Sequence, residues 1–286
     1  LRVDPRVKLI DNRERIQSAA MNTAIKMAQG DWVLRLDAHT YYPDDYLYHC
    51  LITARRTGAA NTGGRWQTRP GGTNYGAEVV QAITTHRFGV GNSPFRTPRP
   101  EGPADTVPFG FFKRSVFEEV GVFDERLERM EDFEFNARLR KSGLVVWLNP
   151  AIRGFYHKKP TLQAFLKKQF LRVSPYNVYL WYLAPYAFSI RHAVTGLFVA
   201  GLLGGVLFSF WWPPGIWIPA VILGVYLFLA VIAAAQQAVH YKRWRHLVVL
   251  PLAFLAFHAV HGMGMWAAVI RLLANRAPVQ QGRAPW

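Results

Sequence analysis

The interpretation of the sequence depends first on the stretch VLRLDAHTYYPDD, residues 33–45. It starts as an alternating apolar run and changes abruptly to Asp37 and His39. Because residues i and i+2 of a strand point to the same face, these two side chains would converge on one ligand if the strand continued that far. The alternative is a polar strand end leading into a loop, which is the more common origin of an isolated Asp-x-His pair.

Length and charge limit the classes of protein to which the chain can belong. The chain has 286 residues, enough for one or two domains with a hydrophobic core. Its first residues resemble the interior of a fold, with a short strand predicted over 7–10, so we expect the domain to begin before Leu1. The net charge of +16 indicates an anionic partner, such as nucleic acid, a phosphorylated substrate or lipid headgroups. With Cys50 as its only cysteine, the chain has no intramolecular disulfide, which suits a reducing compartment.

The first half of the chain has the composition of an α/β domain. Helices are predicted over 15–30 and 44–58, each ending at a glycine, with the strand DWVLRLDAH between them. Two more helices are predicted within 114–143, before a strand at 144–150. Helices that alternate with buried strands predict a doubly wound sheet. The interval 87–106 is rich in Gly and Pro and predicts a long loop, a common form of lid or binding segment.

After about residue 191 the composition becomes that of a membrane protein. Two runs without charge, 193–212 and 216–235, are each long enough to cross the core of a bilayer. A third candidate covers 247–270. It also carries residues that leave a kinked or interfacial segment open, namely His258, His261, Gly262 and Gly264.

The charges beside these runs predict an orientation. The loop between the second and third runs carries Lys242, Arg243 and Arg245, whereas the turn WWPPG carries no charge. Cytoplasmic loops hold the excess of Lys and Arg, so we expect the basic loop and the large N-terminal domain on the cytoplasmic side. The tail contradicts a simple three-span layout, because it is also basic, with Arg271, Arg276 and Arg283.

Further polar residues stand at the ends of predicted elements. Glu131 and Asp132 precede an apparent helix, and His157 follows the strand at 144–150. Gln169 and Arg172 are three residues apart, so on a helix they share one face and can bind the same anion. The surrounding TLQAFLKKQFLRV alternates apolar and basic positions at helical spacing and suits an anionic membrane surface.

In their order and spacing, these motifs resemble the family 2 glycosyltransferases with a GT-A fold, and in particular membrane-anchored members of the succinoglycan-biosynthesis type. The motifs that carry the resemblance are RIQSAAMNTAI, LRLDAHTYYP, DTVPFGFFKRSVFEEVGVFDERL and ERMEDFEFNARLR. The resemblance implies an α/β class with a Rossmann-like mixed sheet, truncated at its N-terminus, over 1–160. It further implies amphipathic interfacial helices over 161–190, a region of two to three transmembrane helices over 191–272, and a tail over 273–286.

The resemblance also assigns a metal site. Asp37 and His39 occupy the Asp-x-Asp position of the family, and His157 matches a histidine that completes the site. The cofactor implied is a divalent metal, Mn²⁺ or Mg²⁺. Because an imidazole replaces the second carboxylate, we expect Mn²⁺ to be favoured.

The remaining roles follow from the same resemblance. Asp132 matches the general base that takes the proton of the acceptor hydroxyl, although a helix-capping role is an alternative. Gln169 and Arg172 match part of the family's Q-x-x-R-W motif for the diphosphate, with Val173 in place of the tryptophan. The acceptor side is assigned to Asp105, Thr106, Gly110 and Glu131, and the approach to the donor nucleotide to Arg15, Asn22 and Arg35.

The sequence therefore predicts an inverting, metal-dependent transferase at the cytoplasmic face of a cell inner membrane. Its partners would be a nucleotide diphospho-sugar, of the UDP type, and a lipid-linked saccharide, as in exopolysaccharide or cell-surface glycan synthesis. A processive polysaccharide synthase remains an alternative, against which the missing tryptophan and the small number of spans count. A non-catalytic membrane-anchored binding protein is another. A nucleic-acid partner is not expected, because the basic residues cluster beside membrane segments and form no reader motif.

Overall fold

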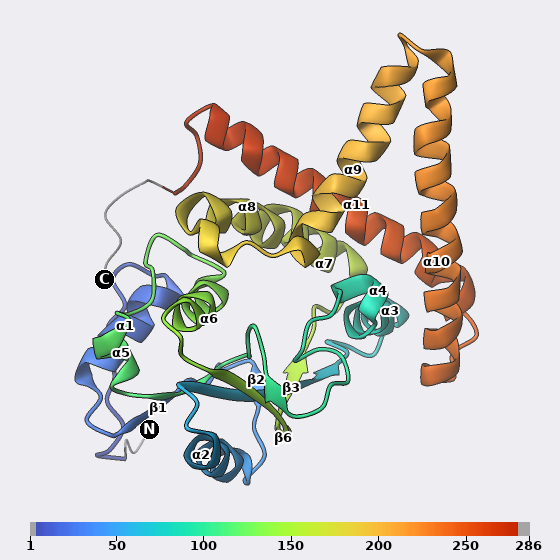
Figure 1. Ribbon diagram of the computed structural model, residues 1–286. Helices are drawn as coiled ribbons and strands as arrows, with labels where there is room; N and C mark the ends of the chain where they lie inside the picture. The colour runs from blue at the N-terminus through green and yellow to red at the C-terminus, as the bar shows by residue number, and fades with distance from the viewer. Residues whose placement is uncertain (1–3, 280–286) are drawn as a thin grey trace.

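The computed structural model describes residues 4–279, and the first part of the chain is built on a six-stranded mixed sheet (Figure 1). The strand order is β1-β5-β3-β6-β2, and β4 pairs with β6. β3 and β6 run parallel, and the other pairs are antiparallel. The predicted α/β class with a mixed sheet is confirmed. The strands are β1 (Trp32–Leu34), β2 (Thr40–Tyr41), β3 (Asn61–Arg69), β4 (Gly102–Pro103), β5 (Phe111–Lys113) and β6 (Val146–His157).

Several predicted element boundaries are wrong. Residues 7–10 form no strand and are largely exposed. The first helix ends at Met27, because the backbone is already extended at Ala28. The last strand continues beyond Pro150, since a bulge in its pairing with β3 lets it pass a residue that cannot donate a ladder hydrogen bond. The helices of this part are α1 (Gln17–Met27), α2 (Tyr46–Thr57), α3 (Tyr75–Thr85), α4 (Arg87–Val90), α5 (Val116–Glu119) and α6 (Glu131–Lys141).

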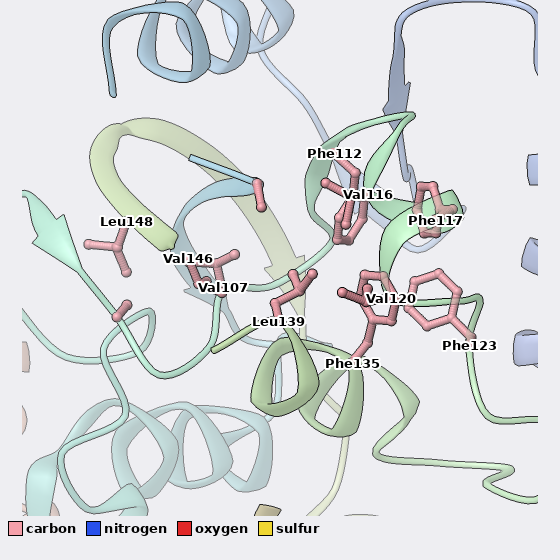
Figure 2. Close-up of a cluster of buried hydrophobic side chains, with 12 residues drawn as sticks. Val107, Phe112, Val116, Phe117, Val120, Phe123, Phe135, Leu139, Val146 and Leu148 are labelled. Carbon is pink, nitrogen blue, oxygen red and sulfur yellow. The ribbon is translucent and has the colours of Figure 1, made fainter. Parts of the chain in front are cut away.

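An aromatic cluster fixes α6 against the sheet (Figure 2). The ring of Phe135, on α6, lies 4.6 Å from that of Phe123 and 5.5 Å from that of Phe112 on β5. Phe117 of α5 stacks on Phe135 at 5.3 Å. Aromatic pairs of this kind add ~0.5–1.5 kcal/mol each beyond the area they bury. The cluster therefore holds the first turn of α6 at a defined place beside the sheet. The face of the sheet opposite to α6 is covered by α2 (Figure 1).

The chain then leaves the sheet through short helices in the range predicted for interfacial helices. They are α7 (Leu162–Lys168), the π-helical turn η1 (Gln169–Val173), α8 (Ser174–Leu183) and the 3₁₀ turn η2 (Pro185–Ala187). Gly264 of a later helix packs against the π-helical turn so closely that a Cβ there would lie 2.1 Å from Oγ of Ser174. The π-helical turn and the later helix are thus fitted to each other.

Three helices within residues 4–279 are long and apolar enough to cross a membrane. They are α9 (Ile190–Ser209), α10 (Trp217–Tyr241, preceded by the 3₁₀ turn η3, Pro213–Ile216) and α11 (His246–Leu273). Figure 1 shows α9 and α10 as a hairpin that projects away from the sheet, whereas α11 runs across α7 and α8. The predicted membrane region is confirmed as a set of apolar helices.

The membrane hairpin is hydrogen-bonded directly to the sheet domain. Gln237 near the end of α10 donates its amide to the carbonyl of Ala82 on α3 at 2.5 Å. The neighbouring Gln236 lies 2.8 Å from the imidazole of His86, just after the same helix. The two parts are therefore docked on each other by specific contacts.

The third helix, α11, contacts the sheet domain at both of its ends. At its start, His246 lies 3.0 Å from the hydroxyl of Tyr75 on α3. Near its end, Ala268 belongs to a buried cluster that includes Leu127 and Phe133 of the sheet domain. In the most apolar stretch of 18 residues in α11, 44% of the residues are buried, compared with 17% in the corresponding stretches of α9 and α10. α11 is thus far more enclosed by protein than α9 and α10.

Candidate active site

The Asp37–His39 pair lies in a tight turn rather than in a strand. β1 ends at Leu34, and the N–H of Thr40 donates to the carbonyl of Asp37 at 3.1 Å. The turn still brings the two side chains together, with Nε2 of His39 3.8 Å from a carboxylate oxygen of Asp37. The Asp37 N–H donates to the hydroxyl of Tyr42 at 2.7 Å, which fixes the turn from the other side. The pair converges as expected, but the strand geometry predicted for it is wrong.

Arg35 joins this turn to the start of α6. Its guanidinium, whose side chain is 12% exposed, donates to Asp37 at 2.9 Å and to Glu131 at 3.3 Å. Burial on its own would lower the pKa of this guanidinium, but the negative charges of Asp132, Asp37 and Glu131 outweigh burial and hold it above the ordinary value. Two segments far apart in the sequence therefore meet around one cation. Arg35 was predicted beside the donor nucleotide, and the structure places it among the carboxylates.

Glu131 and Asp132 are adjacent but have different surroundings. Glu131 is 4% exposed, and its burial, together with the charge of Asp132, raises its pKa to about 7 against the opposing effect of Arg35. Asp132 is only partly buried. Of the two carboxylates, Asp132 is the more accessible, and Glu131 is the internal partner of Arg35.

The start of α6 holds Asp132 in place. Met130, which precedes the helix, has a left-handed backbone with φ of 69°, a conformation that costs a non-glycine residue roughly 1–2 kcal/mol. One oxygen of Asp132 accepts the N–H of Phe133 at 2.8 Å, which leaves its second oxygen for another partner. A carboxylate in the first turn also interacts favourably with the helix dipole. The N-cap position belongs to Met130, so the predicted capping alternative for Asp132 is wrong, and its carboxylate acts within the first turn instead.

His157 follows Tyr156, the register partner of Thr40, but its side chain forms no metal-binding group with those of Asp37 and His39. Its Nδ1 is 3.4 Å from the carbonyl oxygen of Pro70, and its side chain lines a cavity of about 280 Å³. The ring that contacts His39, at 5.0 Å between centroids, is that of Tyr156, which points to the opposite face of β6. The other residues lining the cavity are Tyr41, Arg69 and Phe155.

No three His, Cys, Asp or Glu side chains within residues 4–279 are grouped so that they could hold a metal ion. Asp37 and His39 supply two donors of suitable chemistry, and metals at phosphate-transfer sites take their remaining ligands from substrate phosphates and water. The donors therefore fit a metal that binds together with its substrate. The part assigned to His157 stays a prediction.

The pair predicted to bind the diphosphate lies in the π-helical turn η1. Turns of this kind are frequent at functional sites. Arg172 donates to Glu128 at 2.6 Å, and Tyr176 donates to the other oxygen of Glu128 at 2.6 Å. The carbonyl of Gln169 accepts the hydroxyl of Ser174 at 2.9 Å. Arg172 is thus paired and 56% exposed, and it would have to leave Glu128 to bind a phosphate.

Two residues assigned to the acceptor side have structural partners. Asp105 forms an ion pair with Arg191 at the start of the membrane hairpin. Gly110 has φ of 93°, and a Cβ there would lie 2.3 Å from the ring of Phe112, so only glycine fits. Both residues stabilise the region around the site.

A third acceptor-side residue, Thr106, belongs to a buried chain of amides. Its hydroxyl accepts the amide of Asn136 at 2.9 Å, and Asn136 in turn accepts the amide of Asn61 at 2.6 Å. Asn61 also accepts the N–H of Phe111 at 3.1 Å. This chain connects β3, β5 and α6, and the sequence pattern did not reveal it, because isolated asparagines carry no spacing signal.

The residues assigned to the donor nucleotide differ in their accessibility. Arg15 is exposed just before α1. Asn22 is buried, with its amide donating to Phe123 at 2.9 Å and to Glu125 at 2.8 Å. It also accepts the N–H of Phe123 at 2.9 Å. The side chain of Asn22 is thus occupied in fixing the segment after α5, and its assignment to the nucleotide stays a prediction.

The structure adds a group that the sequence analysis missed. Trp66 and Tyr156 stack in parallel with centroids 4.4 Å apart. The guanidinium of Arg96 lies 5.0 Å from the ring of Trp66, and the ammonium of Lys158 lies 5.4 Å from it. Arg96 comes from the interval 87–106, whose Gly and Pro content did predict a binding segment. Nothing in the sequence indicated that this segment meets β3 and β6.

Residues 2–121 match the family model described as glycosyl transferase family 2. Over these residues the chain is similar to glycosyltransferase family 2, as the sequence motifs predicted. The mixed sheet flanked by helices and followed by membrane helices agrees with the GT-A type of fold predicted from it.

Two curated relatives are similar over much of the chain. The succinoglycan biosynthesis protein ExoA of Rhizobium meliloti (strain 1021) is 33% identical over 165 residues, which are 56% of this chain and 48% of that protein. A dolichyl N-acetyl-alpha-D-glucosaminyl phosphate 3-beta-D-2,3-diacetamido-2,3-dideoxy-beta-D-glucuronosyltransferase of Methanococcus voltae is 27% identical over 212 residues, 69% of this chain and 64% of that protein. The chain thus spans about half of the first relative and less than two thirds of the second.

A solved structure shows a distant likeness. The mannosyltransferase PcManGT from Pyrobaculum calidifontis, in complex with GDP-Man and Mn²⁺, superposes with a TM-score of 0.48 at 15% identity. The superposition covers 92% of this chain and 68% of that one.

Proposed function

We propose that this protein is an inverting glycosyltransferase that moves a sugar from a nucleotide diphospho-sugar, of the UDP type, to a lipid-linked saccharide at a membrane. The observation that carries the proposal is the binding of Asp37 and Glu131 by one buried guanidinium, that of Arg35. This guanidinium brings together the motif with which the family binds its donor and the motif that supplies its general base. The Methanococcus relative supports the acceptor class, because its name describes transfer to a dolichyl-linked sugar phosphate.

The residues of the chain suggest how the transfer proceeds. The free oxygen of Asp132 accepts the proton of an acceptor hydroxyl while that oxygen attacks the anomeric carbon. The bond between the anomeric carbon and the diphosphate oxygen breaks, and its electron pair leaves with the diphosphate. A single displacement inverts the configuration, so an α-linked donor yields a β-glycoside. Arg35 holds the carboxylates in position throughout.

A divalent metal, Mn²⁺ or Mg²⁺, belongs to this proposal. Asp37 and His39 are the residues that would hold it, and the imidazole favours Mn²⁺. Such a metal neutralises charge on a leaving diphosphate when it is bound.

The function is tested directly with membranes that carry the full-length protein. They are incubated with a panel of nucleotide sugars, and the lipid products are identified by mass spectrometry. We expect one nucleotide sugar to extend a lipid-linked saccharide by a single β-linked residue. A ladder of long products would instead support a processive synthase, and the absence of any extended lipid with every donor would refute the proposal.

The proposal places the sheet domain on the cytoplasmic side of a cell inner membrane, and the hairpin of α9 and α10 tests this placement. The uncharged turn between these helices should lie across the membrane from the basic loop that follows α10. Single cysteines replace the exposed Pro214 in the turn and Arg245 in the loop, in a Cys50→Ser background that removes the native thiol. We expect a membrane-impermeant thiol reagent to label them from opposite sides of intact cells and inverted vesicles. Labelling of both from the same side would contradict the hairpin.

A further inference from the structure

Two partly buried cations lie against the ring of Trp66, a third acts electrostatically on both of them, and a fourth acts on the third. They are Arg96, Arg129, Lys158 and Lys168, here called the cationic basin. Within residues 4–279, their side chains form no ion pair or hydrogen bond, and Nε of Arg96 and Nε of Arg129 are buried without a partner. By contrast, the buried guanidinium of Arg35 is fully engaged by carboxylates. Since an uncompensated buried charge is costly, the basin is built for an anion from outside the chain.

The charges of the basin act on one another. Burial, Arg129, Lys159 and Arg96 lower the pKa of Lys168 to about 8. Burial, Arg96 and Lys168 lower the pKa of Lys158 well below its ordinary value. Mutual repulsion of this kind would be relieved by a ligand with more than one negative charge.

The position of the basin indicates where the anion comes from. Lys168 is the last residue of α7, in the short helices that lead to the membrane hairpin. Arg129 follows Glu128, which is bound by Arg172 and Tyr176 of the same helices. The negative charge of Asp132 also acts on Arg96. The basin thus includes a cation influenced by the proposed general base and a cation at the end of α7.

We propose that the cationic basin binds the phosphate groups that join a prenyl lipid to the acceptor saccharide. The inference rests on the proposed function, because it requires a lipid-linked acceptor. Phosphates held there would place the first sugars of the acceptor towards Asp132. The same diphosphate chemistry occurs in the nucleotide donor, so the two sources have to be separated by experiment.

The test measures binding to the full-length protein in detergent. The probes are farnesyl diphosphate, farnesol as the uncharged control, and UDP as the donor-side anion. The fluorescence of Trp66 provides a signal, because Arg96 and Lys158 lie against its ring; calorimetry provides a second measurement. The variants are Arg96→Gln and Lys168→Gln, with Lys167→Gln as the matched control, since Lys167 is the exposed neighbour of Lys168.

We expect farnesyl diphosphate to bind and farnesol not to bind. Each basin variant should weaken binding of farnesyl diphosphate about ten- to hundredfold, the usual effect of losing a charged hydrogen bond. Affinity for UDP, and all affinities of Lys167→Gln, should stay within about twofold. Loss of UDP affinity in the basin variants would assign the basin to the donor, and unchanged affinity for farnesyl diphosphate would remove it as an anion site; both outcomes overturn the inference. Because the assay measures binding, its result is independent of whether any sugar is transferred.

A second, independent observation concerns α11. A helix of its 28 residues is about 42 Å long, longer than the roughly 30 Å core of a bilayer. If it crossed the membrane, its two ends would lie on opposite sides. Yet both ends contact the same sheet domain, through His246 with Tyr75 and through the cluster that includes Ala268 and Phe133.

The exposed face of α11 is a single apolar stripe. At 3.6 residues per turn, its large exposed side chains fall within an arc of about 80°, apart from Leu247 in the first turn. The opposite side of the helix is buried against protein along the whole length. The residues of the stripe are Val248, Leu252, Met263, Trp266, Ile270 and Leu273.

We infer that α11 lies in the plane of the membrane interface, with its apolar stripe in contact with the lipid. The bilayer is then crossed only by α9 and α10 among the helices within residues 4–279. The basic residues Arg271 and Arg276 come to lie on the side of the sheet domain. The conflict between a basic tail and a three-span layout disappears.

Labelling and depth measurements test this placement. With the reagent and Cys50→Ser background described above, Ala274→Cys should label from the same side as Arg245→Cys, and from the side opposite to Pro214→Cys. Spin labels at Val248→Cys and Ile270→Cys should report similar shallow depths, about 5–10 Å into the lipid. Labelling of Ala274→Cys from the side of Pro214→Cys would make α11 a third span, as would depths at opposite leaflets.

Discussion

Asp132→Asn is expected to lower the rate of sugar transfer about 10²- to 10⁴-fold, the usual range for loss of a general base. The substitution keeps the shape of the side chain and its hydrogen bond from the N–H of Phe133, so α6 should remain intact. It removes the basic oxygen that would take the proton of the acceptor. Binding of the nucleotide sugar, measured by calorimetry, should be unchanged.

The neighbouring Glu131 provides the matched control. It is buried against Arg35, and its burial together with the charge of Asp132 raises its pKa. Glu131→Gln keeps the shape of the side chain and an oxygen that Arg35 can donate to, so we expect it to reduce transfer less than Asp132→Asn does. A larger loss of transfer for Glu131→Gln than for Asp132→Asn would indicate that Glu131 is the general base. Full activity of Asp132→Asn would show that another residue is the general base.

Asp37→Ala should reduce transfer to the background rate, a loss of at least about 10²-fold for a group that stabilises charge in the reaction. Asp37 contacts His39 at 3.8 Å and accepts a hydrogen bond from Arg35 at 2.9 Å, so the substitution removes the interactions with both residues. Binding of Mn²⁺, followed by electron paramagnetic resonance during titration, should be lost with it. His39→Asp should retain transfer and move the metal preference towards Mg²⁺, which favours oxygen ligands.

A second Asp–His pair on the surface serves as the control. Asp45 lies 3.3 Å from His49 on α2, and it contacts neither Arg35 nor Glu131 in the described structure. Asp45→Ala should leave transfer and Mn²⁺ binding within about twofold of the parent protein, as expected for an exposed pair. Full transfer by Asp37→Ala in the presence of a chelator would show that the site assignment is wrong.

The sequence was sufficient for features that depend on local patterns. The helix over 44–58 and the apolar runs of α9 and α10 were predicted because periodicity, a terminal glycine and the absence of charge are local signals. The family resemblance placed Asp37 and Glu131 in one site, and the structure brings them together through Arg35.

Features that depend on contacts between distant segments could not be predicted. Asn22 was expected at the nucleotide, yet its amide fixes a segment that follows α5. The continuation of β6 past Pro150 depends on a bulge in its pairing with β3, which no local pattern reveals. Arg96 and Lys158 meet at Trp66 only because the interval 87–106 folds back over the sheet.

The contacts between α10 and α3 have a consequence for the length of the acceptor. Because Gln237 donates to Ala82 and Gln236 lies against His86, α10 is docked on the sheet domain, which restricts the movement of this domain above the membrane. Asp132 is then held at a set height over the lipid surface. On the proposed function, an acceptor anchored in the same membrane would meet Asp132 only if its hydroxyl lay at a matching distance from the lipid. Each acceptor would be extended once, because its new terminal hydroxyl would lie too far from the lipid to reach Asp132.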